Sequence, residues 1–172
     1  MAWSEPLVRF ISSSGVSKPF KGKAAAIPGR LQLSHYDEGG QNVAYKDKDE
    51  ENLTDKKKTY RVGEWVDSTS SVVGHTHAGE WIKYTVDVKE SGTYRATMHY
   101  GTPVYNPRDI ILLVDGKIGG RFDIIRHDPA KGFSLGSYAH IDVKLTKGKH
   151  VFTLVFERGA INLTHIDFKL KK

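Results

Sequence analysis

The 172 residues suffice for one domain with a sizeable core, and the absence of cysteine excludes disulfides, thiolate metal sites and a cysteine nucleophile. No apolar run approaches the length that spans a bilayer, and no signal-peptide pattern is visible at the start of the sequence. The formal net charge of +6 comes from lysines scattered among acidic residues rather than from a basic stripe, which argues against nucleic-acid binding.

The first 26 residues differ in composition from the rest of the chain. Residues 7–11 alternate as a short strand, whereas residues 12–15 and 18–22 are rich in Ser, Gly, Lys and Pro and read as linker. We therefore predict an N-terminal edge strand or linker extension over residues 1–26. A single sandwich domain is predicted over residues 27–172.

The next stretch alternates strands with loops. Residues 30–36 and 43–45 have the pattern of strands, and residues 46–58 are too charged and too poor in apolar periodicity for a core element. We expect residues 46–58 to form an exposed loop. Residues 59–67 are expected to lead back into the sheet.

The clearest strand signal lies in residues 78–88. Its aliphatic and aromatic set should face the core: Ile82, Tyr84, Val86 and Val88. Residues 90–92 then form a turn signal, and residues 93–100 alternate again. This pattern predicts a hairpin at the centre of an antiparallel sheet.

The remaining strands follow at regular spacing. Residues 110–114 form a continuous apolar run, which predicts a strand buried on both faces, and the Asp115-Gly116 pair is a tight-turn signal. Further strands are expected over 117–125, 138–145, 150–156 and 161–170. With nine or ten strands and no helical period, the sequence predicts an all-β sandwich of two antiparallel sheets.

Aromatic residues in loops of a β-sandwich are typical of carbohydrate recognition, because a flat ring stacks on the apolar face of a sugar while polar side chains bind its hydroxyls. Each of these rings has the alternative role of capping the core. The candidates are Tyr60, Trp65, Tyr105 and Phe133, with Asn162 as a polar partner.

Two other kinds of chemistry are open. The His75-x-His77 pair places two imidazoles on one strand face, where His99 and His165 could join them as metal ligands. A glycosidase needs two carboxylates about 5–10 Å apart. Glu64, Asp67 and Glu80 are the candidates, although Glu80 reads more simply as a hydrogen-bond acceptor at a sheet edge.

Six motifs in order resemble the carbohydrate-binding modules of family 6, over residues 27–170. The motifs are IPGRLQLSHYDEGG (27–40), VAYKDKD (43–49), YRVGEWVD (60–67), VGHTHAGEWIKYTV (73–86), GKHVFTLVF (148–156) and INLTHIDF (161–168). The resemblance implies a non-catalytic jelly-roll β-sandwich. It also implies attachment to a secreted glycoside hydrolase, which the module holds on a polysaccharide of the xylan, β-glucan or agarose class.

The resemblance also implies which residues bind the sugar. Tyr60 and Phe133 would be the stacking walls of the main cleft and Asn162 its hydrogen-bonding anchor, with Asp47 and Tyr138 as further carbohydrate-binding candidates. Phe133 stands where the family has Trp, and Tyr138 is the alternative to it. A second cleft on the concave sheet face is implied, without assigned residues.

A structural calcium ion is a further implication. The positions that would hold it carry Gln32, Ser34 and Asp167 here, so two carboxylates of the family pattern are missing. Trp65, an addition to the pattern, is expected to pack under the 46–58 loop. The protein is expected to be a secreted or cell-surface monomer that binds no membrane. The alternatives are a spacer domain without ligand and a small glycan-active enzyme.

Overall fold

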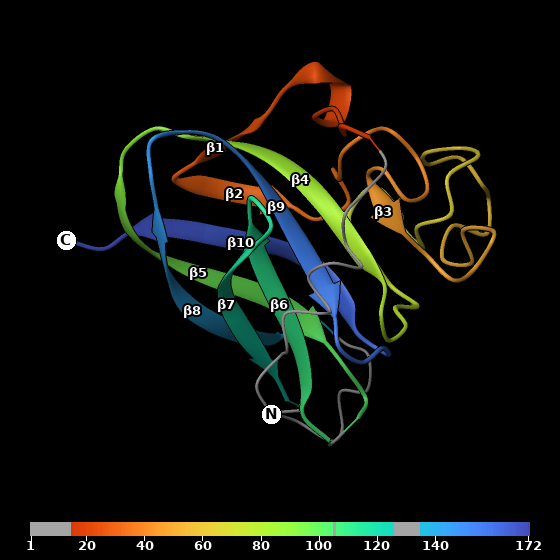
Figure 1. Cartoon of the computed structure of the whole chain (residues 1–172). Helices are drawn as coiled ribbons and strands as arrows, with labels where there is room; N and C mark the ends of the chain where they lie inside the picture. Colours follow the sequence, from red (N-terminus) through yellow and green to blue (C-terminus); the bar gives the residue numbers. More distant parts are fainter. Residues whose placement is uncertain (1–14, 105, 126–134) are drawn as a thin grey trace.

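The structure is a computed structural model, which describes residues 15–104, 106–125 and 135–172 and has the two-layer form of a β-sandwich (Figure 1). The expected strand at residues 7–11 lies outside these residues. The described strands are β1 (Ala25–Ile27), β2 (Gly29–Gln32), β3 (Tyr45–Lys46), β4 (Trp81–Val88), β5 (Gly92–Gly101), β6 (Arg108–Val114), β7 (Lys117–Ile124), β8 (Ser137–Leu145), β9 (Gly148–Phe156) and β10 (Asn162–Leu170). The part of the chain described has one short 3₁₀ turn, η1 (Phe20–Gly22), and no helix in it is long and apolar enough to cross a membrane.

The strands form two sheets, in the orders β1-β4-β9-β6-β7 and β2-β10-β5-β8, with β3 added beside β4. The predicted all-β jelly-roll sandwich is therefore confirmed. One detail differs, because β1 pairs with β4 in parallel, from Ala25 opposite Val86 to Ile27 opposite Val88. β1 runs through Pro28 directly into β2 of the other sheet, so its direction follows from that crossing rather than from a hairpin.

The predicted faces of β4 are confirmed. Ile82, Tyr84, Val86 and Val88 are all buried in the main core between the sheets. The predicted hairpin between β4 and β5 is wrong, because β4 pairs with β9 whereas β5 pairs with β8 and β10. Residues 90–92 instead carry the chain from one sheet to the other. A Ser-Gly turn signal is compatible with either kind of connection, a hairpin or a crossing between sheets.

The apolar run of β6 is buried on both faces, as predicted. Ile110 and Leu112 face the main core, whereas Ile111 and Leu113 form a second buried cluster with Trp81 and Val155 on the other side of the sheet. The Asp115-Gly116 turn joins β6 to β7 with φ values of 50° and 79°. These positive values suit a two-residue hairpin turn.

Residues 47–80 contain no strand. The predicted strand over 30–36 ends at Gln32, and the expected return over 59–67 does not form. The reason is local hydrogen bonding, because the Asp55 carboxylate accepts the N–H groups of Lys57, Thr59 and Tyr60. Side chains thus satisfy the backbone there and replace a sheet partner.

Candidate functional site

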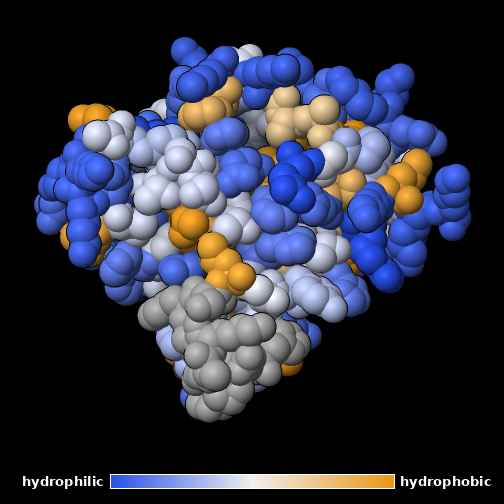
Figure 2. All heavy atoms as spheres, turned by 180° about the vertical axis from the view of Figure 1, so that it is seen from behind, coloured by the Kyte–Doolittle hydropathy of each residue, from blue (hydrophilic) through white to orange (hydrophobic). Residues whose placement is uncertain are grey.

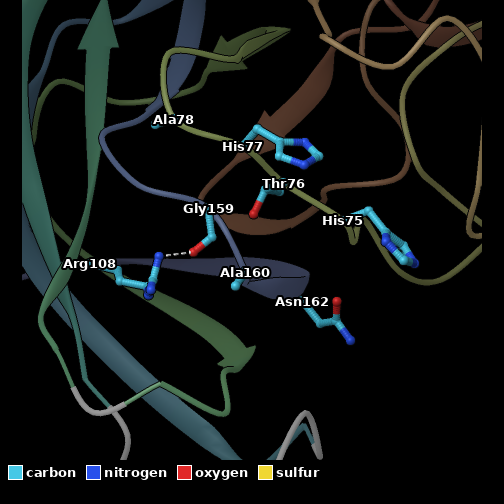
Figure 3. Close-up of a pocket in the computed structure, with 8 residues that line it drawn as sticks. All are labelled: His75, Thr76, His77, Ala78, Arg108, Gly159, Ala160 and Asn162. Carbon is cyan, nitrogen blue, oxygen red and sulfur yellow. Dashed lines mark hydrogen bonds between the residues drawn. The ribbon is translucent and has the colours of Figure 1, made fainter.

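A pocket of about 460 Å³ opens where the segment before β4, the start of β6 and the connection from β9 to β10 meet. Figure 3 shows the residues around it, which come from these three separate parts of the chain. The pocket is lined by His75, Thr76, His77, Ala78, Arg108, Gly159, Ala160 and Asn162.

Backbone hydrogen bonds hold the frame of the pocket. Val73 and Leu163 exchange two N–H···O bonds of 2.9 and 2.8 Å, and the Ala160 N–H donates to the Thr76 carbonyl at 2.8 Å. The two segments approach so closely that a Cβ on Gly159 would lie 1.9 Å from the Thr76 oxygen. Only glycine fits there, which fixes the position of the β9–β10 connection.

His75 and Asn162 project toward the same region of the pocket (Figure 3). His75 has a φ of 44°, a left-handed conformation that few non-glycine residues adopt. A Cβ on Gly74 would lie 2.8 Å from the Asn162 amide oxygen, so this glycine makes room for the amide. Among the described residues the Asn162 side chain has no hydrogen-bond partner, and it remains available to a ligand.

Arg108 contributes a second polar group. One terminal nitrogen of its guanidinium donates to the Gly159 carbonyl, and its Nε is buried with no hydrogen-bond partner. A buried N–H without a partner is costly. The pocket therefore offers an amide, a guanidinium and imidazoles beside the small apolar faces of Ala78 and Ala160.

The three carboxylates that the sequence offers as catalytic candidates all accept structural hydrogen bonds. Glu80 is 3% exposed and accepts the N–H groups of Lys48 (3.1 Å) and His77 (2.7 Å). Both oxygens of Glu64 accept from Arg61, at 2.7 and 3.1 Å. Asp67 accepts the N–H groups of Leu53 and Thr54.

Asp47, a carbohydrate-binding candidate, does not line the pocket and belongs to a group of crowded carboxylates. It lies with Asp49 and Asp67, and one ligand atom from each falls within 4.8 Å of the others, so the group could hold a cation. Burial, followed by the charge of Glu80, raises the pKa of Asp47 to about 8. Burial also raises the pKa of Asp67 to about 6.

Tyr60 does not line this pocket. Its hydroxyl donates to the Ser34 carbonyl at 2.8 Å and its N–H to Asp55, and its side chain is half-buried. Phe133 and Tyr105 lie outside the described residues. Trp65 packs against the main core, and its expected position under the 46–58 loop stays a prediction.

Tyr138 lies on β8 beside a second pocket of about 520 Å³, which Ile125 and His140 also line. Its side chain is 59% exposed, and its ring centroid is 6.5 Å from that of His99 on the neighbouring strand. Figure 2 shows the face opposite to that of Figure 1, which is covered mainly by hydrophilic residues with hydrophobic ones in small separate groups. The structure thus separates Tyr138 from Asn162.

The four histidines considered as metal ligands lie in two separate pairs. His75 and His77 line the first pocket, whereas the rings of His99 and His165 stack at 4.2 Å on the four-stranded sheet. Within the described ranges, no group of three metal-ligating side chains includes His75 or His77. His99 and His165 therefore do not join the His75-x-His77 pair, because they lie on β5 and β10 whereas residues 75–77 belong to the segment before β4.

The residues implied for calcium do not fit that ion as they are arranged. The Gln32 amide donates to the Ser71 carbonyl, and the Ser34 hydroxyl donates to the Ser70 carbonyl. Both oxygens of Asp167 accept from the Arg30 guanidinium, at 2.8 and 3.0 Å. Calcium needs six or more oxygen ligands, and here a cationic side chain already neutralises the carboxylate.

Arg108 and Gly159 were not predicted as site residues. Arg108 stands at the start of β6, more than 50 positions from Asn162, so no local pattern connects the two. Gly159 has the pattern of a turn residue, but its close contact with Thr76 exists only in the folded chain.

Comparison with known proteins places this chain in a family. The sequence matches the model of the family described as carbohydrate binding module (family 6), over residues 44–172. No curated protein sequence matches the chain.

Solved structures share the fold at low sequence identity. A family 6 module from Clostridium stercorarium, solved with cellobiose, has a TM-score of 0.62 and 16% identity, covering 87% of this chain and 99% of its own. The family 6 module of lichenase 5A from Cellvibrio mixtus, solved with cellotriose, has a TM-score of 0.59 and 18% identity, covering 84% and 98%. A family 35 module from Clostridium thermocellum has a TM-score of 0.52 and 14% identity, covering 91% and 98%.

Proposed function

The chain belongs to family 6 of the carbohydrate-binding modules, and from this premise we propose that it binds a neutral polysaccharide in the pocket around Asn162. The module itself carries no catalysis in this proposal. Its role is to hold an attached glycoside hydrolase on a polysaccharide of the xylan, β-glucan or agarose class, outside the cell. A monomer suffices for this role.

The free Asn162 amide is the observation that carries the proposal. An amide presents one acceptor and two donors, which matches the hydroxyl edge of a sugar. Arg108 lines the same pocket, and its guanidinium adds a cationic hydrogen-bond donor group. The His75 imidazole, projecting on the Asn162 side, offers a flat face against which a pyranose ring can pack (Figure 3).

Neighbouring structures support the ligand class. Two structures similar in fold were solved with cellobiose and cellotriose, which are short β-linked glucans. The three carboxylates that were catalytic candidates, Glu64, Asp67 and Glu80, each accept hydrogen bonds within the fold. This agrees with a binding role rather than a catalytic one. The calcium ion remains a prediction, and Gln32 and Asp167 are the residues to which it is assigned.

Affinity electrophoresis tests the proposal. The chain is run in gels containing xylan, β-1,3-glucan, mixed-linkage glucan, hydroxyethyl cellulose or agarose, with and without a chelator. Asn162→Ala should weaken binding of the retarding glycan by about 1 kcal/mol, or roughly fivefold, because one hydrogen-bonding anchor is lost.

Tyr138→Ala is the matched control, since it alters the other pocket and leaves Asn162 intact. If Tyr138→Ala abolishes retardation while Asn162→Ala does not, the ligand binds on the sheet face and our assignment of the site is wrong. If no glycan retards the folded chain, the spacer interpretation replaces binding.

A further inference from the structure

Two imidazoles and a carboxylate meet on the face of the four-stranded sheet that points away from the core. His99 on β5 lies directly opposite His165 on β10, and Asp167 follows two residues later on the same face. Each histidine has its Nε2 atom 3.6 Å from the Asp167 Oδ2 atom. The potential ligand atoms all lie within 4.8 Å of one another.

These separations suit a shared ion better than direct hydrogen bonds. An N–H···O bond is normally no longer than about 3.2 Å. Ligand atoms about 2.1 Å from a zinc ion in tetrahedral geometry lie about 3.4 Å apart. The two 3.6 Å edges are therefore close to those of a metal centre. Because the two rings are stacked with 22° between their planes, the partly exposed His99 ring must turn for its lone pair to reach the same ion.

Thr164 can set the tautomer of His165. Its Oγ1 atom lies 2.9 Å from the His165 Nδ1 atom and 3.4 Å from the His99 carbonyl oxygen. When the hydroxyl donates to that carbonyl, it accepts the Nδ1–H of His165, which leaves a lone pair on Nε2, and the proposed site requires this tautomer. This Nε2 is buried and has no hydrogen-bond partner.

In this tautomer the His165 Nε2 lone pair faces the Asp167 Oδ2 atom at 3.6 Å with no hydrogen between them. A cation that accepts electron pairs would give the unpartnered Nε2 atom a partner.

We propose that His99, His165 and Asp167 form a binding site for a divalent transition-metal ion of the Zn²⁺ class. Two imidazole nitrogens and one carboxylate oxygen are donors that suit Zn²⁺, Co²⁺ or Ni²⁺, whereas Ca²⁺ prefers oxygen alone. Three protein ligands leave a position open for water or for a ligand group. This site is separate from the pocket around Asn162 and does not depend on the proposed function.

Two further residues affect the affinity of this site for a metal ion in opposite directions. Thr164 orients the His165 ring, as a second hydrogen-bonding partner of a metal-bound histidine commonly does. Arg30 holds the Asp167 carboxylate in place, but its positive charge opposes a dication. The two effects make distinct predictions for substitution.

Isothermal titration of the untagged chain with Zn²⁺ tests the site. Binding with one equivalent is expected. His99→Gln and His165→Gln should each weaken it at least about tenfold. His140→Gln, on the adjoining strand β8, is the matched control and should bind as the unaltered chain does.

Two substitutions test the details of the arrangement. Thr164→Val removes the orienting hydroxyl at nearly constant volume and should weaken Zn²⁺ binding by about 10- to 100-fold. Arg30→Gln should strengthen it, because the opposing charge is gone. In the nitrogen NMR spectrum of labelled histidines, Zn²⁺ should shift the Nε2 signals of His99 and His165.

Other outcomes overturn the proposal. Binding kept in His99→Gln but lost in the double variant His75→Gln, His77→Gln would move the metal to the first pocket. No Zn²⁺ binding by the folded chain up to millimolar concentration would remove the site. Since His99 is partly exposed, its variant should fold even if His165→Gln does not.

Discussion

Single polar residues, rather than strands, hold the long segment between β3 and β4. The Asp55 carboxylate accepts three backbone N–H groups, and Glu80 connects the Lys48 and His77 backbones. The Arg61 guanidinium stacks on the Tyr36 ring, 3.5 Å from its centroid, and donates to two backbone carbonyls. One well-placed charge thus satisfies several backbone groups where no sheet partner exists.

Asp47 should make stability depend on pH. Its pKa is about 8 in the folded protein, far above the ordinary value of 3.8. Between these two values the folded chain keeps a proton that the unfolded chain loses, so stability falls as pH rises from about 4 to about 8. The slope from one such group approaches about 1.4 kcal/mol per pH unit.

Urea unfolding across this range, with chelator present, measures the effect. Asp47→Asn should flatten the profile and gain stability above pH 8, whereas Asp123→Asn, with an exposed side chain, should leave it unchanged. An equally steep profile in Asp47→Asn would show that other groups are responsible.

At the scale of elements, strand faces were predictable and strand partners were not. The alternation of β4 identified Ile82 and Tyr84 as core residues, because period-two patterning depends only on neighbouring residues. Its pairing with β9, about 70 residues later, depends on contacts that no local pattern encodes. The turn after β4 was located, but its direction across the sandwich was not.

The same division applies to the candidate site. Asn162 was identified by its place in a motif near a strand start, and the structure puts it in a pocket. Arg108 was not predicted as a site residue, because an arginine at the start of a strand is usually exposed and has no role in binding. Asp47 was associated with the sugar by motif position, and the structure adds that its carboxyl is buried.

Strand β10 joins the two sheets through one aromatic contact. Phe168 on β10 and Phe152 on β9 lie with ring centroids 5.5 Å apart across the core. Phe168→Ala should lower the free energy of unfolding by about 3–5 kcal/mol, because the deleted ring leaves a cavity.

Lys169→Ala, at the exposed neighbouring position, is the control and should change stability by less than about 0.5 kcal/mol. Thermal and urea unfolding both report the difference. A loss below about 1 kcal/mol for Phe168→Ala would mean that the core closes around the missing ring.

At the scale of the whole molecule, the net charge and the shape of the pocket affect binding separately. The net charge of +6 attracts any polyanion, whereas the pocket around Asn162 requires a fitting sugar. Salt shortens the range of the first effect, from about 10 Å at 0.1 M to about 3 Å at 1 M.

Retardation by a sulfated galactan should therefore disappear when the salt concentration is raised, while retardation by a neutral glycan should persist. Affinity gels run at low and high salt measure both in parallel. Salt-resistant binding of the sulfated polymer, together with loss of binding in Asn162→Ala, would instead identify an anionic sugar as the ligand of the pocket.

The frame of the pocket has a consequence for how binding preferences change in evolution. Main-chain bonds between residues 73–76 and 160–163, and the absence of a side chain at Gly159, hold the walls without help from the side chains of His75 or Asn162. Those two side chains can therefore be exchanged while the scaffold stays the same. A lineage can adopt a new sugar by altering a few codons, and a combinatorial library at these positions should yield folded proteins with altered selectivity.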